Sequence, residues 1–118
     1  MSYTVNFHPE FALEFKALPL PVQDELLAYV ELLMLMGHGL KRPYADTLKG
    51  SNYTNMKELR FKAMDGVWRF AYAFDPLRCC IVLVGGDKSG GSEKRFYKQL
   101  IAKADKRFHQ HLQAIKEE

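Results

Sequence analysis

Three basic residues, Arg60, Arg69 and Lys88, come from three consecutive segments in the second half of the chain. Arg60 and Arg69 lie in runs of alternating side chains that predict strands, and Lys88 follows a third such run. Paired strands would point both guanidinium groups to one face of a sheet, near Lys88. Convergent cations of this kind stabilise the negative charge that builds up when an RNA 2′-hydroxyl attacks the adjoining phosphate.

The two arginines fit a structural role equally well. Glu58 lies two residues before Arg60, so its side chain is expected on the same face as Arg60 and Arg69. An ion pair between Arg69 and Glu58, or a ladder of salt bridges across the two strands, would also explain these residue types. The sequence leaves both interpretations open.

The segment that follows the third strand is the most basic part of the chain. Residues 86–107 contain seven basic and three acidic residues. Glycines precede a helix that we expect to begin at Glu93 with Ser92 as its N-cap, and the N–H groups of such a helix start bind anions. The residues predicted to bind RNA or phosphate, here and on the first of the three strands, are Lys57, Asp87, Lys94, Arg95 and Lys98.

Other kinds of site are not indicated by the pattern. Lys88 follows Asp87 and is not part of a Gly-Lys-Ser/Thr motif, so no nucleotide-binding P-loop is expected. The histidines are isolated or, as with His109 and His111, stand two apart on a predicted helix and do not share a face. We therefore predict no metal site and no cofactor, and no Ser/His/Asp triad can be assigned.

The composition is that of an ordinary globular protein. The 118 residues are 47% hydrophobic and 26% charged, which predicts one domain over residues 1–118. The net charge of +3 is unevenly distributed, because residues 1–55 have four basic and six acidic side chains and residues 56–118 have thirteen and eight. This segregation favours a phosphate-bearing partner, although it also occurs in proteins without one.

The chain shows no sign of export or of a membrane segment. Met1 to Phe7 lacks a basic stretch followed by an apolar run, so no secretory signal is expected and the cytoplasm is the default location. The apolar stretch Leu26 to Met36 contains Glu31 and is too short to span a bilayer. Adjacent strand residues point to opposite faces, so Cys79 and Cys80 are expected to be reduced.

Hydrophobic periodicity and turn residues predict the element order β-α-α-β-β-β-α. The linkers between the last three strands carry hairpin-type residues, so we expect antiparallel neighbours in a small sheet backed by helices, an α+β fold. The expected strands are Tyr3 to Phe7, Met56 to Phe61, Val67 to Phe74 and Cys79 to Val84. The expected helices run from Pro9 to Leu18, from Pro21 to Met36, and from Glu93 to near the C-terminus.

The strand Val67 to Phe74 predicts how the sheet is covered. Its aromatic side chains share one face, which should be buried under helices, whereas Arg69 stands among small neighbours on the other face and has room to meet a phosphate. The helix from Pro21 is apolar on several sides, so either it is covered within the domain or part of it awaits a partner chain. Lys41 to Asn55 is predicted as a long polar loop, a type that is often functional.

Three segments in this order resemble a known family: Met56-Lys57-Glu58-Leu59-Arg60-Phe61, Trp68-Arg69-Phe70-Ala71-Tyr72 and Gly86-Asp87-Lys88. They are similar to the RelE/ParE toxin superfamily, nearest its phage-derived HigB-like branch, and the likeness covers residues 3–112. The resemblance implies the toxin of a type II toxin-antitoxin system, held in check by a cognate antitoxin of the helix-turn-helix type. It also implies metal-independent cleavage of messenger RNA on the ribosome, in which Arg60, Arg69 and Lys88 bind the phosphate and stabilise the transition state or leaving group.

The resemblance does not identify the general base. The chain has no histidine at a matching position, which leaves Tyr97, Asp87 or a lysine of depressed pKa as candidates. Gly85 to Gly91 also departs from the Lys-Lys-Thr-rich stretch common in this branch. Two alternatives to the ribonuclease are a ParE-like inhibitor of DNA gyrase and a non-catalytic relative that only binds an antitoxin. The second predicted helix and the loop Lys41 to Asn55 are the expected antitoxin contacts.

Overall fold

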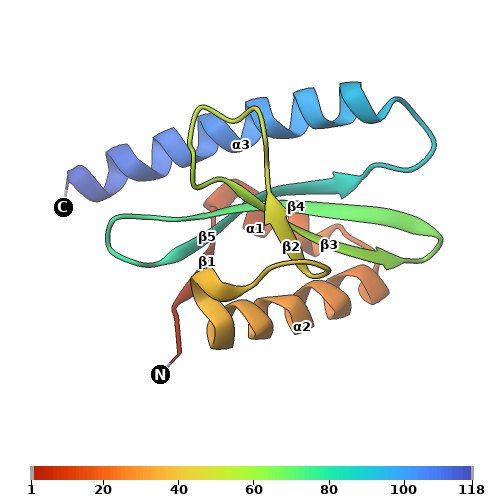
Figure 1. Ribbon diagram of the computed structural model, residues 1–118, viewed down its shortest axis with the longest axis horizontal. Helices are drawn as coiled ribbons and strands as arrows, with labels where there is room; N and C mark the ends of the chain where they lie inside the picture. Colours follow the sequence, from red (N-terminus) through yellow and green to blue (C-terminus); the bar gives the residue numbers. More distant parts are fainter. Residues whose placement is uncertain (1, 118) are drawn as a thin grey trace.

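A five-stranded sheet forms the centre of the computed structural model, which describes residues 2–117. The strand order across the sheet is β1-β5-β4-β3-β2, and helices lie on both faces (Figure 1). The elements are β1 (Val5–Phe7), α1 (Pro9–Lys16), α2 (Leu20–Met36), the short 3-10 helix η1 (Gly37–Gly39), β2 (Ala45–Thr47), β3 (Lys57–Ala63), β4 (Gly66–Phe74), β5 (Cys80–Asp87) and α3 (Glu93–Lys116). The predicted α+β class is confirmed.

The alternating pattern of β4 divides the core into two layers. Phe70, Tyr72 and Phe74 pack with residues of α1 and α2 on one face of the sheet. Ala71 and Ala73 point to the opposite face and pack against α3, which lies along that side of the sheet in Figure 1. The prediction that the aromatic face lies under helices is therefore confirmed, and small residues face α3 because the helix approaches the sheet closely there.

Two features of the sheet differ from the prediction. β2 lies inside the segment predicted as loop and pairs antiparallel with β3, so that Asp46 is opposite Glu58. β1 pairs with β5 in parallel, whereas β3, β4 and β5 form the expected antiparallel meander. Three residues are too few to show a periodicity of two, which is why β2 is visible only through its pairing with β3.

β5 also continues beyond Val84, where the sequence predicted its end. Gly85 and Gly86 are strand residues opposite Phe70 and Arg69. A Cβ at position 85 would lie 2.0 Å from Cδ1 of Phe70, so glycine is required here by the packing of an aromatic ring against the backbone. The longer strand carries Asp87 and Lys88 to the start of α3.

The face predicted to be open is covered by α3. Leu100, Ala104 and Phe108 pack against the sheet, and Arg69 is consequently only 6% exposed. Ser92 caps α3 as predicted, because its hydroxyl accepts a hydrogen bond of 3.2 Å from the backbone N–H of Arg95. Both cysteines are free thiols, although Cys79 lies just before β5 and only Cys80 within it. Within residues 2–117, no helix has the length and apolarity needed to cross a membrane.

Candidate active site

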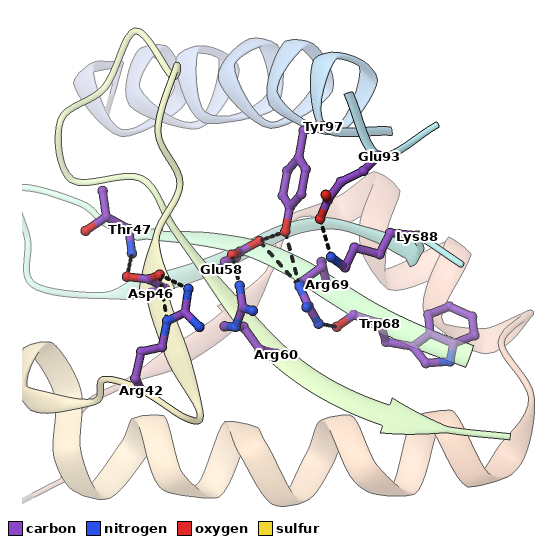
Figure 2. Close-up of polar contacts among 10 residues, drawn as sticks. All are labelled: Arg42, Asp46, Thr47, Glu58, Arg60, Trp68, Arg69, Lys88, Glu93 and Tyr97. Carbon is purple, nitrogen blue, oxygen red and sulfur yellow. Dashed lines mark hydrogen bonds and ion pairs between the residues drawn. The ribbon is translucent and has the colours of Figure 1, made fainter. Parts of the chain in front are cut away.

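A pocket of ≈ 320 Å³ opens between β2, β3 and the first turns of α3. Figure 2 shows the polar side chains that meet there. The lining residues are Arg42, Asp46, Thr47, Leu48, Lys49, Glu58, Arg60, Lys88, Glu93 and Tyr97. The lining has four cationic and three acidic side chains, and this small excess of positive charge favours an anion such as a phosphate group.

The pairing of β3 with β4 brings the two predicted arginines together. Arg60 lies directly opposite Arg69 in the register, and both side chains reach Glu58 on the same face of the sheet. Nη1 of Arg60 is 2.6 Å from Oε2 of Glu58, and Nε of Arg69 is 3.9 Å from Oε1. The convergence and the ion pairing anticipated from the sequence are therefore both present.

Glu58 occupies the centre of this arrangement. Its side chain is 5% exposed, yet it forms part of the pocket wall. Besides the two arginines it contacts Tyr97, whose hydroxyl donates a hydrogen bond of 2.9 Å to Oε1. The sequence indicated Glu58 only as an ion-pair partner, because the convergence of groups from β3, β4 and α3 on one carboxylate is a property of the tertiary structure.

Tyr97 connects Glu58 to Arg69. Its hydroxyl oxygen accepts a hydrogen bond of 3.2 Å from Nε of Arg69 while donating to Glu58. Burial, together with the hydrogen bond to the Glu58 carboxylate, raises the pKa of the Tyr97 phenol above its ordinary value. The phenol therefore keeps its proton at neutral pH, which argues against Tyr97 as the general base.

Arg69 lies behind the pocket and does not line it. Nη1 of Arg69 donates a hydrogen bond of 2.9 Å to the carbonyl oxygen of Trp68. The remaining contacts of the guanidinium group are with Tyr97 and Glu58. The room for a phosphate expected beside Arg69 is thus filled by Tyr97 of α3, and the geometry gives Arg69 the task of orienting Tyr97 and balancing the charge of Glu58.

Lys88 reaches the pocket from the end of β5. Its ammonium group pairs with Glu93 in the first turn of α3 and lies 5.9 Å from the ring centroid of Tyr97. The hydrogen bond from Lys88 lowers the pKa of the Glu93 carboxyl. Glu93 is largely exposed, so an incoming phosphate can replace it on Lys88 at little cost.

The opposite rim of the pocket contains residues that the sequence did not single out. Arg42 pairs with Asp46 of β2, with Nη2 2.8 Å from Oδ2, and this contact lowers the pKa of the Asp46 carboxyl. Lys49 follows on the same rim. The four-residue spacing of Arg42 and Asp46, in a segment without helical character, gave no signal, since only the pairing of β2 with β3 brings this rim to the site.

The remaining predicted residues lie outside the pocket. Lys57 alternates with Glu58 and points to the α2 side of the sheet. Lys94, Arg95 and Lys98 line a separate hollow on α3. The carboxylate of Asp87 holds the loop together by accepting hydrogen bonds from its neighbours. Burial opposes its ionisation, but the bonds from Ser89 and Val67 outweigh this effect and lower the pKa of Asp87.

No set of three potential ligands from His, Cys, Asp or Glu comes together within residues 2–117 to hold a metal ion. Buried His8 and half-buried His111 have other partners. His8 accepts a hydrogen bond from the backbone N–H of Glu10 at the start of α1, and His111 lies 2.7 Å from Asp75.

Known proteins are similar to this chain in sequence and in fold. Residues 13–109 match the family described as "Phage derived protein Gp49-like (DUF891)". The putative toxin HigB3 of Mycobacterium tuberculosis is 39% identical over 99 residues, which are 84% of each chain. The putative toxin HigB2 of the same organism is 39% identical over 88 residues, 74% of this chain and 43% of HigB2.

A solved structure extends the comparison to the fold. A mutant of the E. coli toxin RelE in the free state superposes with a TM-score of 0.66 at 15% sequence identity, covering 91% of this chain and 98% of RelE. At that identity the likeness concerns the fold alone, whereas the family match spans most of the chain. The resemblance stated from the sequence is confirmed: the chain belongs to the phage-derived Gp49-like family, is homologous to HigB toxins and has a RelE-like fold.

Proposed function

We propose that this HigB-like toxin of the type II toxin-antitoxin class is an endoribonuclease that cleaves messenger RNA in the pocket between β2, β3 and α3. The observation that carries the proposal is the presence of Glu58, Arg60 and Lys88 in one pocket. A buried carboxylate beside two cations supplies a proton acceptor and charge stabilisation at the same place. These are the two requirements of RNA cleavage by its own 2′-hydroxyl.

The proposed mechanism assigns the base to Glu58. The 2′-oxygen attacks the adjoining phosphorus atom while its proton passes to the Glu58 carboxylate. Arg60 and Lys88 bind the non-bridging oxygens, where negative charge increases in the transition state. The bond from phosphorus to the 5′-oxygen then breaks, and that oxygen takes a proton from the Lys88 ammonium group. The products are a 2′,3′-cyclic phosphate and a 5′-hydroxyl.

Tyr97 and Arg69 act in this scheme as positioning residues. Tyr97 holds one oxygen of Glu58 by its hydrogen bond of 2.9 Å, and Arg69 holds the Tyr97 hydroxyl. The second oxygen of Glu58 contacts Arg60 at 2.6 Å. A carboxylate fixed on both sides is preorganised for the reaction, so little reorganisation is required when the substrate arrives.

The pocket alone offers little binding energy for a long RNA. Its volume of ≈ 320 Å³ is at the lower end of the range of ligand-binding clefts. Most of the positioning of the scissile linkage would then come from outside the pocket. This supports the further proposal that the toxin acts on mRNA held by the ribosome, as the resemblance to RelE and HigB toxins implies.

The experiment is to express the protein and map transcript 5′ ends, comparing wild type with Arg60→Gln. We expect ribosome-dependent breaks in the wild type and their loss in Arg60→Gln, because this variant removes a cation from the pocket. Lys57→Gln is the matched control, since Lys57 is on the same strand but points to the other face. Intact transcripts together with gyrase-dependent DNA damage would instead identify a ParE-like inhibitor.

The partner implied by the toxin class is a cognate antitoxin, which we propose to be a helix-turn-helix protein that docks on α2. Leu20 and Leu35 on this helix are 70% and 69% exposed. Tyr44 packs against Tyr29, with ring centroids 6.0 Å apart, and continues the apolar surface into the segment before β2. An exposed apolar surface of this kind is typical of a protein interface.

A further inference from the structure

Basic side chains also cover the outer face of α3, away from the pocket. This outer face comprises Lys94, Arg95, Lys98, Lys103 and Lys106, with Gln99 and Ala102 between them. All five cations are exposed, and none of them forms an ion pair within the part of the chain that the structure describes. They differ in this respect from Arg42, Arg60 and Lys88 of the pocket, which each contact a carboxylate.

The carboxylates near this face have other partners. Glu93 pairs with Lys88. Asp105 accepts a 2.5 Å hydrogen bond from the Ser51 hydroxyl and one of 2.9 Å from the Asn52 backbone N–H, and so fastens the segment before β3. Glu10 of α1, at the far end, lies 3.6 Å from Arg107. None of these three carboxylates pairs with the five cations, so the outer face keeps a net positive charge.

The outer face is long and shallow. Two hollows of ≈ 560 and ≈ 600 Å³ follow one another along it and share Gln99 and Ala102. Lys106 lies twelve residues after Lys94, which corresponds to about 18 Å at the rise of 1.5 Å per residue of an α-helix. A row of cations of this length can contact several phosphates of one nucleic acid.

The side chains of the outer face favour RNA over a protein partner. All large hydrophobic side chains that are exposed lie elsewhere in the described chain, on α1, α2 and the turns. Protein interfaces depend on buried aromatic and aliphatic anchors, which α3 does not offer. A phosphate backbone requires only cations, because its binding is driven by charge neutralisation and the release of counterions.

The position of the outer face favours a duplex over the strand that is cut. By the 3.6-residue repeat of the helix, Arg95 and Lys106 lie on the side of α3 opposite Tyr97, and Tyr97 faces the pocket. A strand leaving the pocket would have to bend around α3 to reach them. A rigid double helix can meet Arg95, Lys98 and Lys106, which lie toward one side of α3, without bending, and duplex RNA is bound largely through its backbone shape.

We infer that the outer face of α3 is a second RNA site, which binds the phosphate backbone of double-stranded RNA separately from the pocket that cuts. The inference rests on the proposed function only in taking RNA as the partner. The toxin would then hold a structured RNA on one side of α3 while cleaving a single strand on the other side.

The experiment measures binding of a 2′-O-methyl RNA duplex, which lacks the attacking hydroxyl, by fluorescence anisotropy at several salt concentrations. The test variant is Arg95→Gln/Lys98→Gln/Lys106→Gln. We expect weaker binding and a salt slope smaller by about three, one for each lost phosphate contact. Lys16→Gln/Lys41→Gln/Lys62→Gln removes the same net charge from exposed positions outside α3 and should retain the wild-type slope.

Several results would overturn the inference. The first is an equal salt slope in the two triple variants. The second is equally tight binding of a single strand with the same number of phosphates. The third is a test variant that loses more affinity for a polyglutamate peptide than for the duplex. Thermal denaturation and far-ultraviolet circular dichroism show whether the test variant is folded. A wild type that cleaves no RNA, but whose duplex binding is lost in the test variant, would disprove the proposed function and leave the second site standing.

Discussion

Among single residues, Glu58 combines burial of a carboxylate with several polar partners. It is a buried carboxylate that satisfies both oxygens with Arg60, Arg69 and Tyr97. A purely structural ion-pair network would place such a group away from solvent, yet Glu58 lines the pocket beside Lys88. The contact with the pocket is the reason for preferring a catalytic role over the salt-bridge ladder that the sequence also allowed.

We predict that Glu58→Gln abolishes most of the cleavage. Glutamine keeps the size and can accept the Tyr97 hydrogen bond, but it cannot take the proton of the 2′-hydroxyl, so the rate should fall by roughly 10²–10⁴. Its amide group is also a poorer partner for Arg60, and the expected loss of stability is about 1–3 kcal/mol. Single-turnover cleavage and urea denaturation measure the two effects. Wild-type cleavage by folded Glu58→Gln would rule Glu58 out as the base.

The sequence predicted the part of the site that depends on the alternation of side chains along strands. The positions of Glu58, Arg60 and Arg69 on one face follow from the period of two, and their meeting follows from the hairpin. The burial of Arg69 could not be foreseen, because it depends on where Tyr97 of α3 comes to lie above the sheet. The same holds for Arg42, which reaches the pocket only through β2.

Among the elements, α3 is attached to the rest of the molecule by polar contacts as well as by its apolar stripe. Arg107 is 5% exposed and donates a hydrogen bond of 2.8 Å to the carbonyl oxygen of Leu83 in β5. The same guanidinium group holds Glu14 of α1 through two contacts, one of them 2.8 Å long. A single side chain therefore joins α3, α1 and the sheet. This connection helps to hold α3, and with it Tyr97, in place next to Glu58.

We predict that Glu14→Gln reduces stability at neutral pH and that the difference from wild type disappears in acid. The hydrogen bond from Arg107 lowers the pKa of Glu14. A carboxyl with a lowered pKa stabilises the fold above its unfolded pKa, and this contribution is lost as the pH falls through the folded value. Urea denaturation from about pH 7 to about pH 3 tests it. A wild-type advantage that persists at the acid end would contradict the assignment, and exposed Glu31→Gln is the control.

Element boundaries show where local sequence signals fail. Pro9 and Ser92 correctly predicted the starts of α1 and α3, since a proline in the first turn and a serine N-cap are local signals of a helix start. Gly85 and Gly86 suggested a break but belong to β5, because glycine there makes room for aromatic rings from β4 and α3. The parallel pairing of β1 with β5 was also hidden, since it joins segments more than seventy residues apart.

Across the whole molecule, the two longest helices differ in the charge and the apolar character of their exposed surfaces. Residues 20–36 contain three acidic and no basic residues, and α2 carries five of the exposed large hydrophobic side chains. α3 has exposed cations and no such apolar side chain. Since α2 and α3 lie on opposite faces of the sheet (Figure 1), we expect that an antitoxin docked on α2 leaves the outer face of α3 free for RNA.

We predict that Leu27→Glu/Leu35→Glu on α2 weakens binding of the cognate antitoxin and leaves RNA cleavage intact. These leucines are 46% and 69% exposed, so the change costs little stability, whereas two buried charges at an interface should lower affinity by roughly a hundredfold or more. Titration with the cognate antitoxin gives the affinity. Leu77→Glu is the matched control, because Leu77 is 64% exposed on the turn before β5. Unchanged affinity in the α2 variant would place the antitoxin elsewhere, and inhibition without contact to α2 would then require it to cover the pocket.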